Sequence, residues 1–119
     1  MAWPTIDDGF PDHPKVAGLS DAAFRLHVSG ICYSARHLTD GIIDAAMVPR
    51  LVPAFRRRTL VELVDRGMWI QVPFGDAYSI HDYLEWNRSR EQVIDSRERL
   101  RAVRSEAGRK GAEARWQTA

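Results

Sequence analysis

Apolar residues recur at helical spacing in two parts of the chain. Between residues 21 and 37 they fall every three or four positions, which predicts an amphipathic helix. Ser20 precedes this stretch, and its hydroxyl can accept a hydrogen bond from a free amide of the first turn. A second stripe follows Phe55 and consists of Leu60, Val61, Leu63 and Val64. It predicts a helix that stops at Gly67, because glycine readily adopts the left-handed conformation that ends helices.

Shorter apolar segments predict a small sheet. Met68–Val72 and Ala77–His81 flank the turn formed by residues 73–76, which is the pattern of a β-hairpin. Ile42–Ile43 is a two-residue apolar patch that follows a Thr-Asp-Gly turn. We expect it to join the hairpin as a third strand.

Three further segments have helical patterns. Asp44 is expected to cap a short helix over residues 45–52, although Pro49 would remove a hydrogen bond inside it unless the proline lies in the first turn. The alternative for this segment is two short turns. Asp82 is expected to cap another helical segment after the hairpin. Residues 90–107 predict a charged helix with a thin apolar seam. A basic, flexible end at residues 108–111 is expected to follow.

The order helix, strand, helix, helix, strand, turn, strand is that of a winged helix-turn-helix. The sequence therefore predicts an α+β fold, a winged helix-turn-helix with an added C-terminal helix. Residues 1–18, which contain three prolines, are expected to form an extended N-terminal arm, with Trp3, Ile6 and Phe10 available to pack on the domain and room for a helical turn around Lys15–Ala17. Residues 19–87 form the winged helix-turn-helix domain, and residues 88–119 form a basic C-terminal helix and flexible tail.

Composition narrows the class of protein. The chain has 119 residues and a single cysteine, Cys32, which excludes an internal disulfide and fits a reducing cytoplasm. Neither a signal peptide nor an apolar run long enough to span a membrane is recognisable, so we expect a cytoplasmic protein without membrane contact. The formal net charge is only +1, but residues 88–119 carry nine basic and five acidic side chains.

The residues that could support catalysis form no recognisable motif. The four histidines, His13, His27, His37 and His81, lie at no metal-ligand spacing, and no glycine-rich phosphate loop is present. The adjacent side chains of His81 and Asp82 are expected to diverge at the end of a strand. We therefore expect a non-enzymatic protein with no catalytic residue, no metal site and no cofactor.

Clustered basic residues are candidates for DNA contacts. Arg56, Arg57 and Arg58, with Thr59, begin the second predicted helix, where arginine can bind phosphates or a guanine edge. In the tail, Arg97, Arg101, Arg104, Arg109 and Lys110 could add affinity that is independent of DNA sequence. Two alternatives stay open: the three consecutive arginines could instead pair with Glu62 and Asp65, and the tail could be a mixed-charge or self-associating helix.

The hairpin turn favours a different interpretation. Phe74-Gly75-Asp76 holds no cation, and an aspartate there would repel a phosphate. The alternative function is a protein–protein interaction module, for example one that binds a host factor. Its contacts would be made by exposed aromatic residues, namely Trp69, Phe74, Trp86 and Trp116. A homodimer formed through residues 90–107 is a third prediction.

Several short motifs resemble a known family. They are DHPKV at residues 12–16, LSDAAFRLH at 19–27, HLTDG at 37–41, LVDRGMW at 63–69 and HDYLEWN at 81–87. Together these look like small winged helix-turn-helix proteins of actinobacterial phages and prophages, similar to the N-terminal domain of phage replication-initiation (replisome-organiser) proteins. The resemblance implies double-stranded DNA binding in replication initiation or transcription regulation inside a bacterial host cell. It also implies replication or host proteins as partners.

Overall fold

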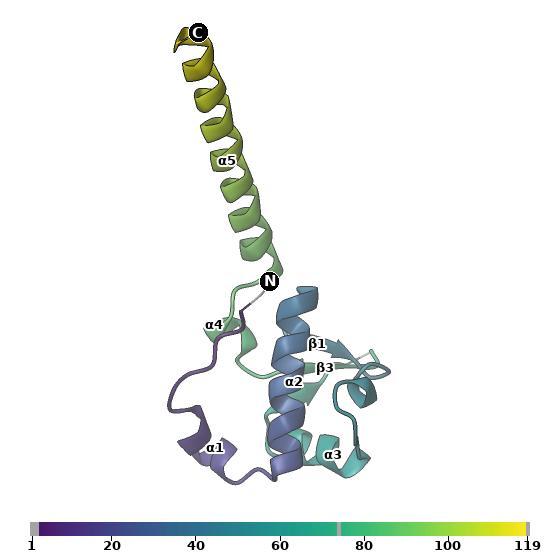
Figure 1. Ribbon diagram of the computed structural model, residues 1–119. Helices are drawn as coiled ribbons and strands as arrows, with labels where there is room; N and C mark the ends of the chain where they lie inside the picture. Colours follow the sequence, from purple (N-terminus) through teal and green to yellow (C-terminus); the bar gives the residue numbers. More distant parts are fainter. Residues whose placement is uncertain (1–2, 74, 119) are drawn as a thin grey trace. The chain divides into compact units, whose positions relative to one another are not determined.

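The computed structural model describes residues 3–73 and 75–118 (Figure 1). The chain divides into two compact units, Met1–Ser89 and Arg90–Ala119. The first unit contains every strand of the described residues, and the second is a single helix.

The helix α2, Asp21–His37, is the longest element of the first unit and has the predicted bounds. The Ser20 hydroxyl accepts a hydrogen bond from the amide of Ala23 at 3.2 Å, which confirms the expected cap. Leu38 ends the helix in the left-handed conformation, with φ of 55°. The buried face of α2 consists of Ala23, Leu26, His27, Gly30, Ile31 and Ser34.

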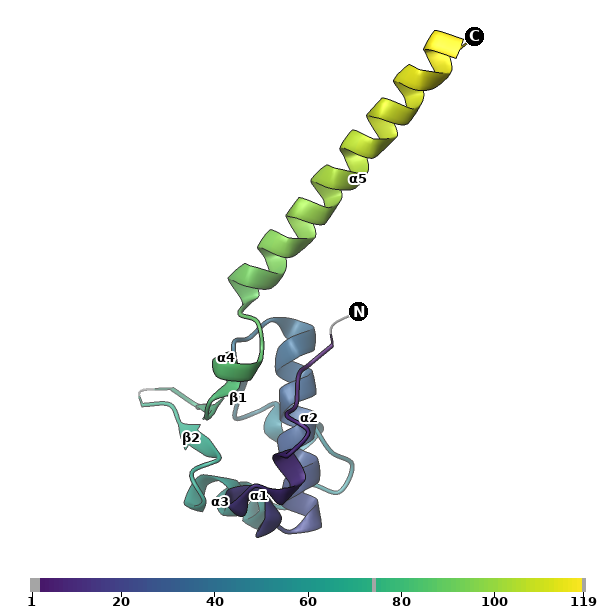
Figure 2. The same ribbon diagram turned by 90° about the vertical axis from the view of Figure 1, so that its left-hand side faces the viewer.

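Three short strands form one antiparallel sheet in the order β1-β3-β2 (Figure 2). They are β1 at Ile42–Asp44, β2 at Trp69–Gln71 and β3 at Ala77–Ile80. The predicted hairpin is confirmed, and the short strand joins it along β3, with Ile43 opposite Tyr78. Trp69, which lies opposite Ile80, is completely buried. The prediction that Trp69 is an exposed contact residue is therefore wrong.

The helix α3, Arg57–Asp65, ends at Gly67 as predicted. Gly67 has φ of +73°, and its amide donates to the carbonyl of Val64. The next amide, that of Met68, donates to the carbonyl of Leu63. These two bonds form a Schellman motif, which satisfies the free carbonyls at the helix end.

The helix predicted over residues 45–52 is much shorter in the structure. A single 3-10 turn, η2, spans Val48–Arg50. Pro49 lies in the first turn of this element, and Pro53 follows it. Prolines have no backbone donor and disfavour helical geometry in the residue before them, so the segment cannot extend into an α-helix. The element order of a winged helix-turn-helix is preserved, with a 3-10 turn as its second helix.

The N-terminal arm is only partly extended. It forms a 3-10 turn, η1, at Phe10–Asp12 and a short helix, α1, at Pro14–Ala17. The Phe10 ring stacks on His27, with a centroid distance of 5.5 Å and an interplanar angle of 16°. Trp3, which was expected to pack on the domain, is 83% exposed.

The short helix α4, Tyr83–Trp86, follows β3. Asp82 occupies the cap position but has φ of 61°, and its side chain accepts no cap hydrogen bond, so the predicted capping role is wrong. Its carboxylate instead lies 3.2 Å from Nε2 of His81. The expected divergence of these two side chains is therefore also wrong, because the left-handed backbone at Asp82 turns the carboxylate back toward its neighbour.

The second unit is the helix α5, Arg90–Thr118. It extends beyond the predicted end at residue 107 and continues through Gly108 and Gly111. At a rise of about 1.5 Å per residue, it is about 43 Å long. Its apolar residues include Leu100 and Val103, which are 49% and 66% exposed in the unit. Dimerisation through residues 90–107 stays a prediction, which light scattering at two concentrations would test.

Candidate nucleic-acid interface

The start of α3 presents three arginines to solvent. Arg56 is the N-cap residue, and its side chain makes no capping bond. Arg57 and Arg58 are the first two residues of the helix, and all three side chains are exposed. None of them forms an ion pair with any residue that the structure describes. Their positive charges lie at the helix end where the macrodipole is also positive, which is a favourable place for an external anion.

The predicted alternative partner of these arginines, Glu62, is bound elsewhere. One oxygen of its carboxylate accepts the Ser20 amide at 2.7 Å, and the other accepts the Ser20 hydroxyl at 2.8 Å. The backbone bond from Ser20 is the main cause that lowers the pKa of Glu62 below its usual value. Glu62 therefore joins α3 to the N-terminus of α2, and it leaves the arginines of α3 unpaired.

Thr59 does not belong to this exposed cluster. It is only 8% exposed and lies on the face of α3 that packs on the core, with Leu60 and Leu63. The burial of Thr59 argues against the predicted DNA contact of this residue.

The solvent face of α3 contains a residue that the sequence interpretation placed in the core. Val61 is 45% exposed and lies one turn after Arg57. Its neighbours in sequence, Leu60 and Leu63, are buried, so Val61 lies on the opposite side of the helix. Helical spacing could have shown this, since residues three or four apart share a face and Val61 is three or four residues from both Arg57 and Arg58.

The charges of α5 are separated onto two faces. Arg97, Arg101 and Arg104 are spaced by four and then three residues, which places them on one face of a helix. At about 100° per residue, Asp95, Glu106 and Glu113 lie on the opposite side of the helix, and Glu91 and Glu98 lie between the two faces. We call Arg97, Arg101 and Arg104 the basic stripe.

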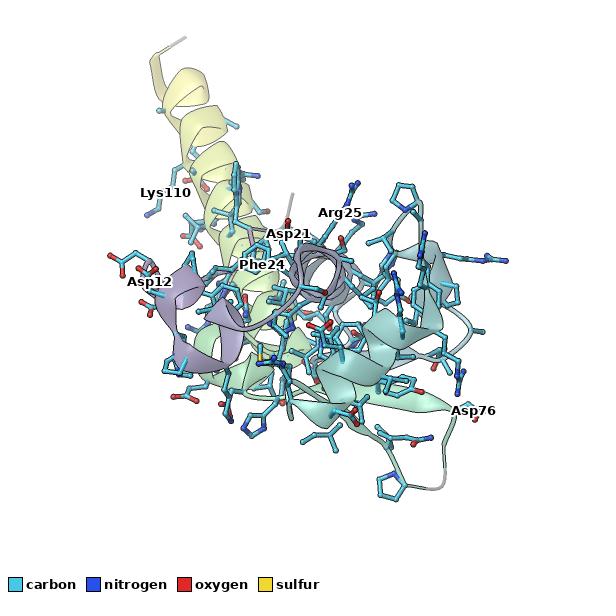
Figure 3. All side chains as sticks on the ribbon, turned by 90° about the horizontal axis from the view of Figure 1, so that it is seen from below. Asp12, Asp21, Phe24, Arg25, Asp76 and Lys110 are labelled. Atoms are coloured by element: carbon cyan, nitrogen blue, oxygen red, sulfur yellow. The ribbon has the colours of Figure 1, made fainter. Side chains whose placement is uncertain are left out.

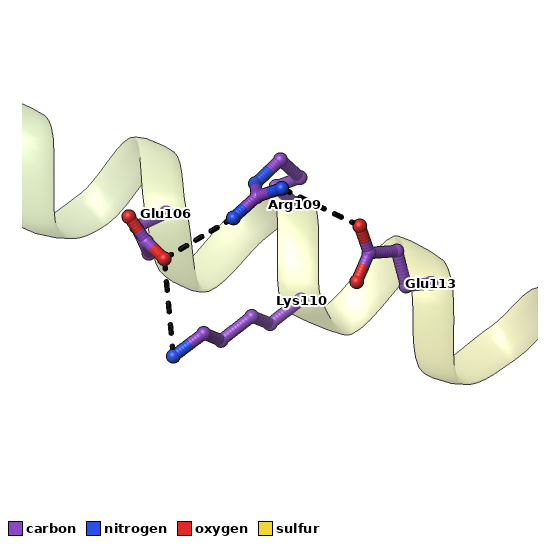
Figure 4. A network of polar contacts seen from close by, with 4 residues as sticks. All are labelled: Glu106, Arg109, Lys110 and Glu113. Carbon is purple, nitrogen blue, oxygen red and sulfur yellow. Dashed lines mark hydrogen bonds and ion pairs between the residues drawn. The ribbon is translucent and has the colours of Figure 1, made fainter.

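The remaining basic residues in the middle of α5 are neutralised on the acidic side. Arg99 pairs with Asp95 at 2.9 Å. Arg109 lies 3.2 Å from Glu106 and 3.6 Å from Glu113, and Lys110 lies 3.9 Å from Glu106 (Figure 4). By contrast, the basic stripe forms no ion pair with the described residues of the chain. The structure thus divides the predicted tail residues into an unpaired group and a paired group.

The hairpin turn adds no positive charge. Figure 3 shows Asp76 at the end of the hairpin, on the edge of the domain, and its side chain is exposed. Pro73 and Gly75 are also exposed, whereas Phe74 lies outside the described residues. This turn therefore offers no cation for a phosphate contact among its described residues.

Two searches of the described residues were negative. No group of three or more histidine, cysteine or acidic side chains is arranged to hold a metal ion among residues 3–73 and 75–118. In the same part of the chain, no helix combines the length and the apolar character that crossing a bilayer requires. In comparisons with known proteins, no family model, curated protein or solved structure matches the chain.

Proposed function

We propose that this protein binds double-stranded DNA and acts in replication initiation or transcription regulation in a bacterial cell. The observation that supports this function is the distribution of unpaired positive charge. Six exposed arginines, at the start of α3 and along the basic stripe, make no ion pair within the described chain. Other basic residues of α5 are paired with carboxylates a single turn away.

In the proposed complex, α3 enters the major groove. Arg57 and Arg58 bind phosphates or the acceptor edge of a guanine, for which the forked guanidinium is well suited. Val61, one turn further along the same face, contacts the methyl group of a thymine. Asp65 follows at the end of the exposed face and limits how far the helix can lie along the phosphate backbone.

The basic stripe supplies affinity that does not depend on sequence. Each phosphate that it neutralises releases counterions and contributes about 0.9 to the slope of log affinity against log salt. Three such contacts account for a slope of about 3. A helix with this arrangement can follow a line of phosphates, because Arg97 and Arg104 are two turns and about 10 Å apart.

The test compares two triple variants of α5 with the same change in charge. Arg97→Gln/Arg101→Gln/Arg104→Gln removes the basic stripe, and Arg99→Gln/Arg109→Gln/Lys110→Gln removes the paired cations. Binding to a random duplex is measured by fluorescence anisotropy over a range of salt concentrations. We expect the first variant to lose about 3 from the salt slope and the second to change it much less. Equal losses of salt slope in the two variants would mean that only net charge matters. An absence of duplex binding by the wild type would refute the proposed function.

A second experiment tests the role of α3. Changing Arg56 and Arg57 together to Ala should weaken binding by a few kcal/mol, at about 1–3 kcal/mol for each good contact. Val61→Ala should reduce the preference for sites that contain the contacted thymine over sites that lack it. The affinity for random duplex should change little. An unchanged affinity at moderate salt for the Arg56 and Arg57 variant would show that α3 is not the helix that meets DNA.

One observation favours the alternative function, a protein–protein interaction module. Ile42 and Ile70 are 44% and 49% exposed, and both lie opposite Ser79 across the sheet. Directly opposed residues share a face, so these two isoleucines form an apolar patch on the open side of the sheet. A heparin column separates the two functions: a DNA-binding protein should stay bound until several hundred millimolar salt, and an interaction module should not.

A further inference from the structure

A cavity of about 300 Å³ lies beneath the N-terminal arm in the first unit. Residues of the arm form one wall, including Ile6 and Phe10, and the body of the domain contributes Ile31, Met68 and Ile80. The arm is tied over this space by the Thr5 amide, which donates to Oδ1 of Asn87 at 2.7 Å. The volume is at the lower end of the range for small-molecule sites, and the wall is mostly apolar, as in such sites.

One polar group of the wall has an unused donor. His27 is only 3% exposed and lines the cavity. Its Nδ1 accepts the indole N–H of Trp69 at 2.9 Å. In a neutral imidazole the proton must then be on Nε2, which makes that atom a donor. No described residue accepts a hydrogen bond from it.

The ring is held neutral and fixed in orientation. Burial lowers the pKa of His27 to about 4, so the imidazole carries no charge near neutral pH. Phe10 stacks against one face of the ring. A flip of the imidazole would break the hydrogen bond from Trp69, so this bond fixes the orientation of the ring. A donor fixed in this way selects a ligand by the position of its acceptor.

We propose that this cavity binds a small uncharged molecule with an apolar body and one carbonyl oxygen, which accepts the hydrogen bond from Nε2 of His27. The apolar wall requires an apolar body. The carbonyl accepts the proton of Nε2, for which the described residues provide no acceptor. A charged ligand would lose its hydration in this mostly apolar space.

The first test uses the full-length wild-type protein and three probes of similar size: benzamide, toluene and benzoate. Binding is followed by NMR through the indole N–H of Trp69 and the methyl groups of Met68 and Ile80. Benzamide should bind with an affinity on the order of millimolar, because a ligand with few atoms has little contact to make. Toluene should bind about tenfold more weakly, since it lacks the acceptor, and benzoate should not bind. No shift of these signals with benzamide at its solubility limit would overturn the proposal.

The second test asks whether His27 supplies the hydrogen bond. His27→Phe keeps a ring against Phe10 and removes both nitrogens. It should weaken benzamide about tenfold and leave toluene unchanged. Equal losses for the two probes would show that His27 is only part of the wall and would overturn its role as donor. If this variant fails to fold, the Nε2–H signal of His27 in the wild type decides: it must shift with benzamide and not with toluene.

Discussion

Replacing Gly30 by alanine should destabilise the domain, although alanine is the better helix former. Gly30 is a buried residue of α2 and lies next to Trp69 and Ile43 of the sheet. A Cβ at this position would be 2.7 Å from Cζ2 of Trp69 and 3.0 Å from Cδ1 of Ile43. Both of these side chains are completely buried, so neither can move into solvent to make room.

Two opposing effects set the change in the free energy of unfolding that Gly30→Ala causes. Alanine in the interior of a helix is favoured over glycine by about 1 kcal/mol. Forcing one extra methyl group into a packed core costs about 1–3 kcal/mol. Rotation of the Trp69 ring away from the new methyl would also break its bond to His27, at a cost of about 1 kcal/mol. The net loss in the free energy of unfolding should therefore be about 1–3 kcal/mol.

Urea unfolding monitored by tryptophan fluorescence measures this difference. Gly108→Ala is the matched control, because it is the same substitution in a helix with no other atom within 4 Å of the added Cβ. We expect the control to raise the helical circular dichroism signal and to leave the unfolding midpoint of the first unit unchanged. A Gly30→Ala variant that is as stable as the wild type, or more stable, would refute the close packing of α2 on Trp69.

Two predictions concern the response to acid. Since burial lowers the folded pKa of His27 to about 4 from 6.5, the unfolded chain binds more protons between these values, and stability should fall as pH drops from 6.5 toward 4. From pH 7 to pH 5 we expect a loss of about 2 kcal/mol in urea unfolding, which His27→Phe should abolish and His37→Asn should retain. The folded pKa of Glu62 is also lowered, so its contribution is present above the unfolded value of 4.5 and is lost as pH falls through the folded pKa. Glu62→Gln should therefore lower the free energy of unfolding by about 1 kcal/mol at pH 7 and should weaken its dependence on pH below pH 4. A variant as stable as the wild type at pH 7 would contradict the role of the bonds between Glu62 and Ser20.

The local elements of the first unit were predictable because their signals are local. The cap at Ser20, the stop at Gly67 and the hairpin between residues 68 and 81 each depend on the conformational preferences of a few adjacent residues. The segment 45–52 shows the limit of this reasoning. Its apolar pattern predicts a helix, but the two prolines within and after it restrict the structure to one 3-10 turn.

The candidate site was predictable only in part. The sequence identified the exposed arginines of α3 and the basic residues of α5, and the spacing of Arg97, Arg101 and Arg104 already contained the basic stripe. It could not show that Glu62 binds Ser20, because the two residues are 42 positions apart. The two interpretations of the arginines of α3 could therefore be separated only in the folded chain.

By itself, the sequence determined α2, α3, the hairpin and the regions where positive charge is concentrated, because backbone preferences and helical spacing act over a few residues. The tertiary structure alone decided that Thr59 and Trp69 are buried, that Val61 faces solvent and that His27 lines a cavity and accepts a hydrogen bond from Trp69. Each of these depends on which face of an element packs against distant residues. That choice is made by the burial of the whole core and not by any local pattern.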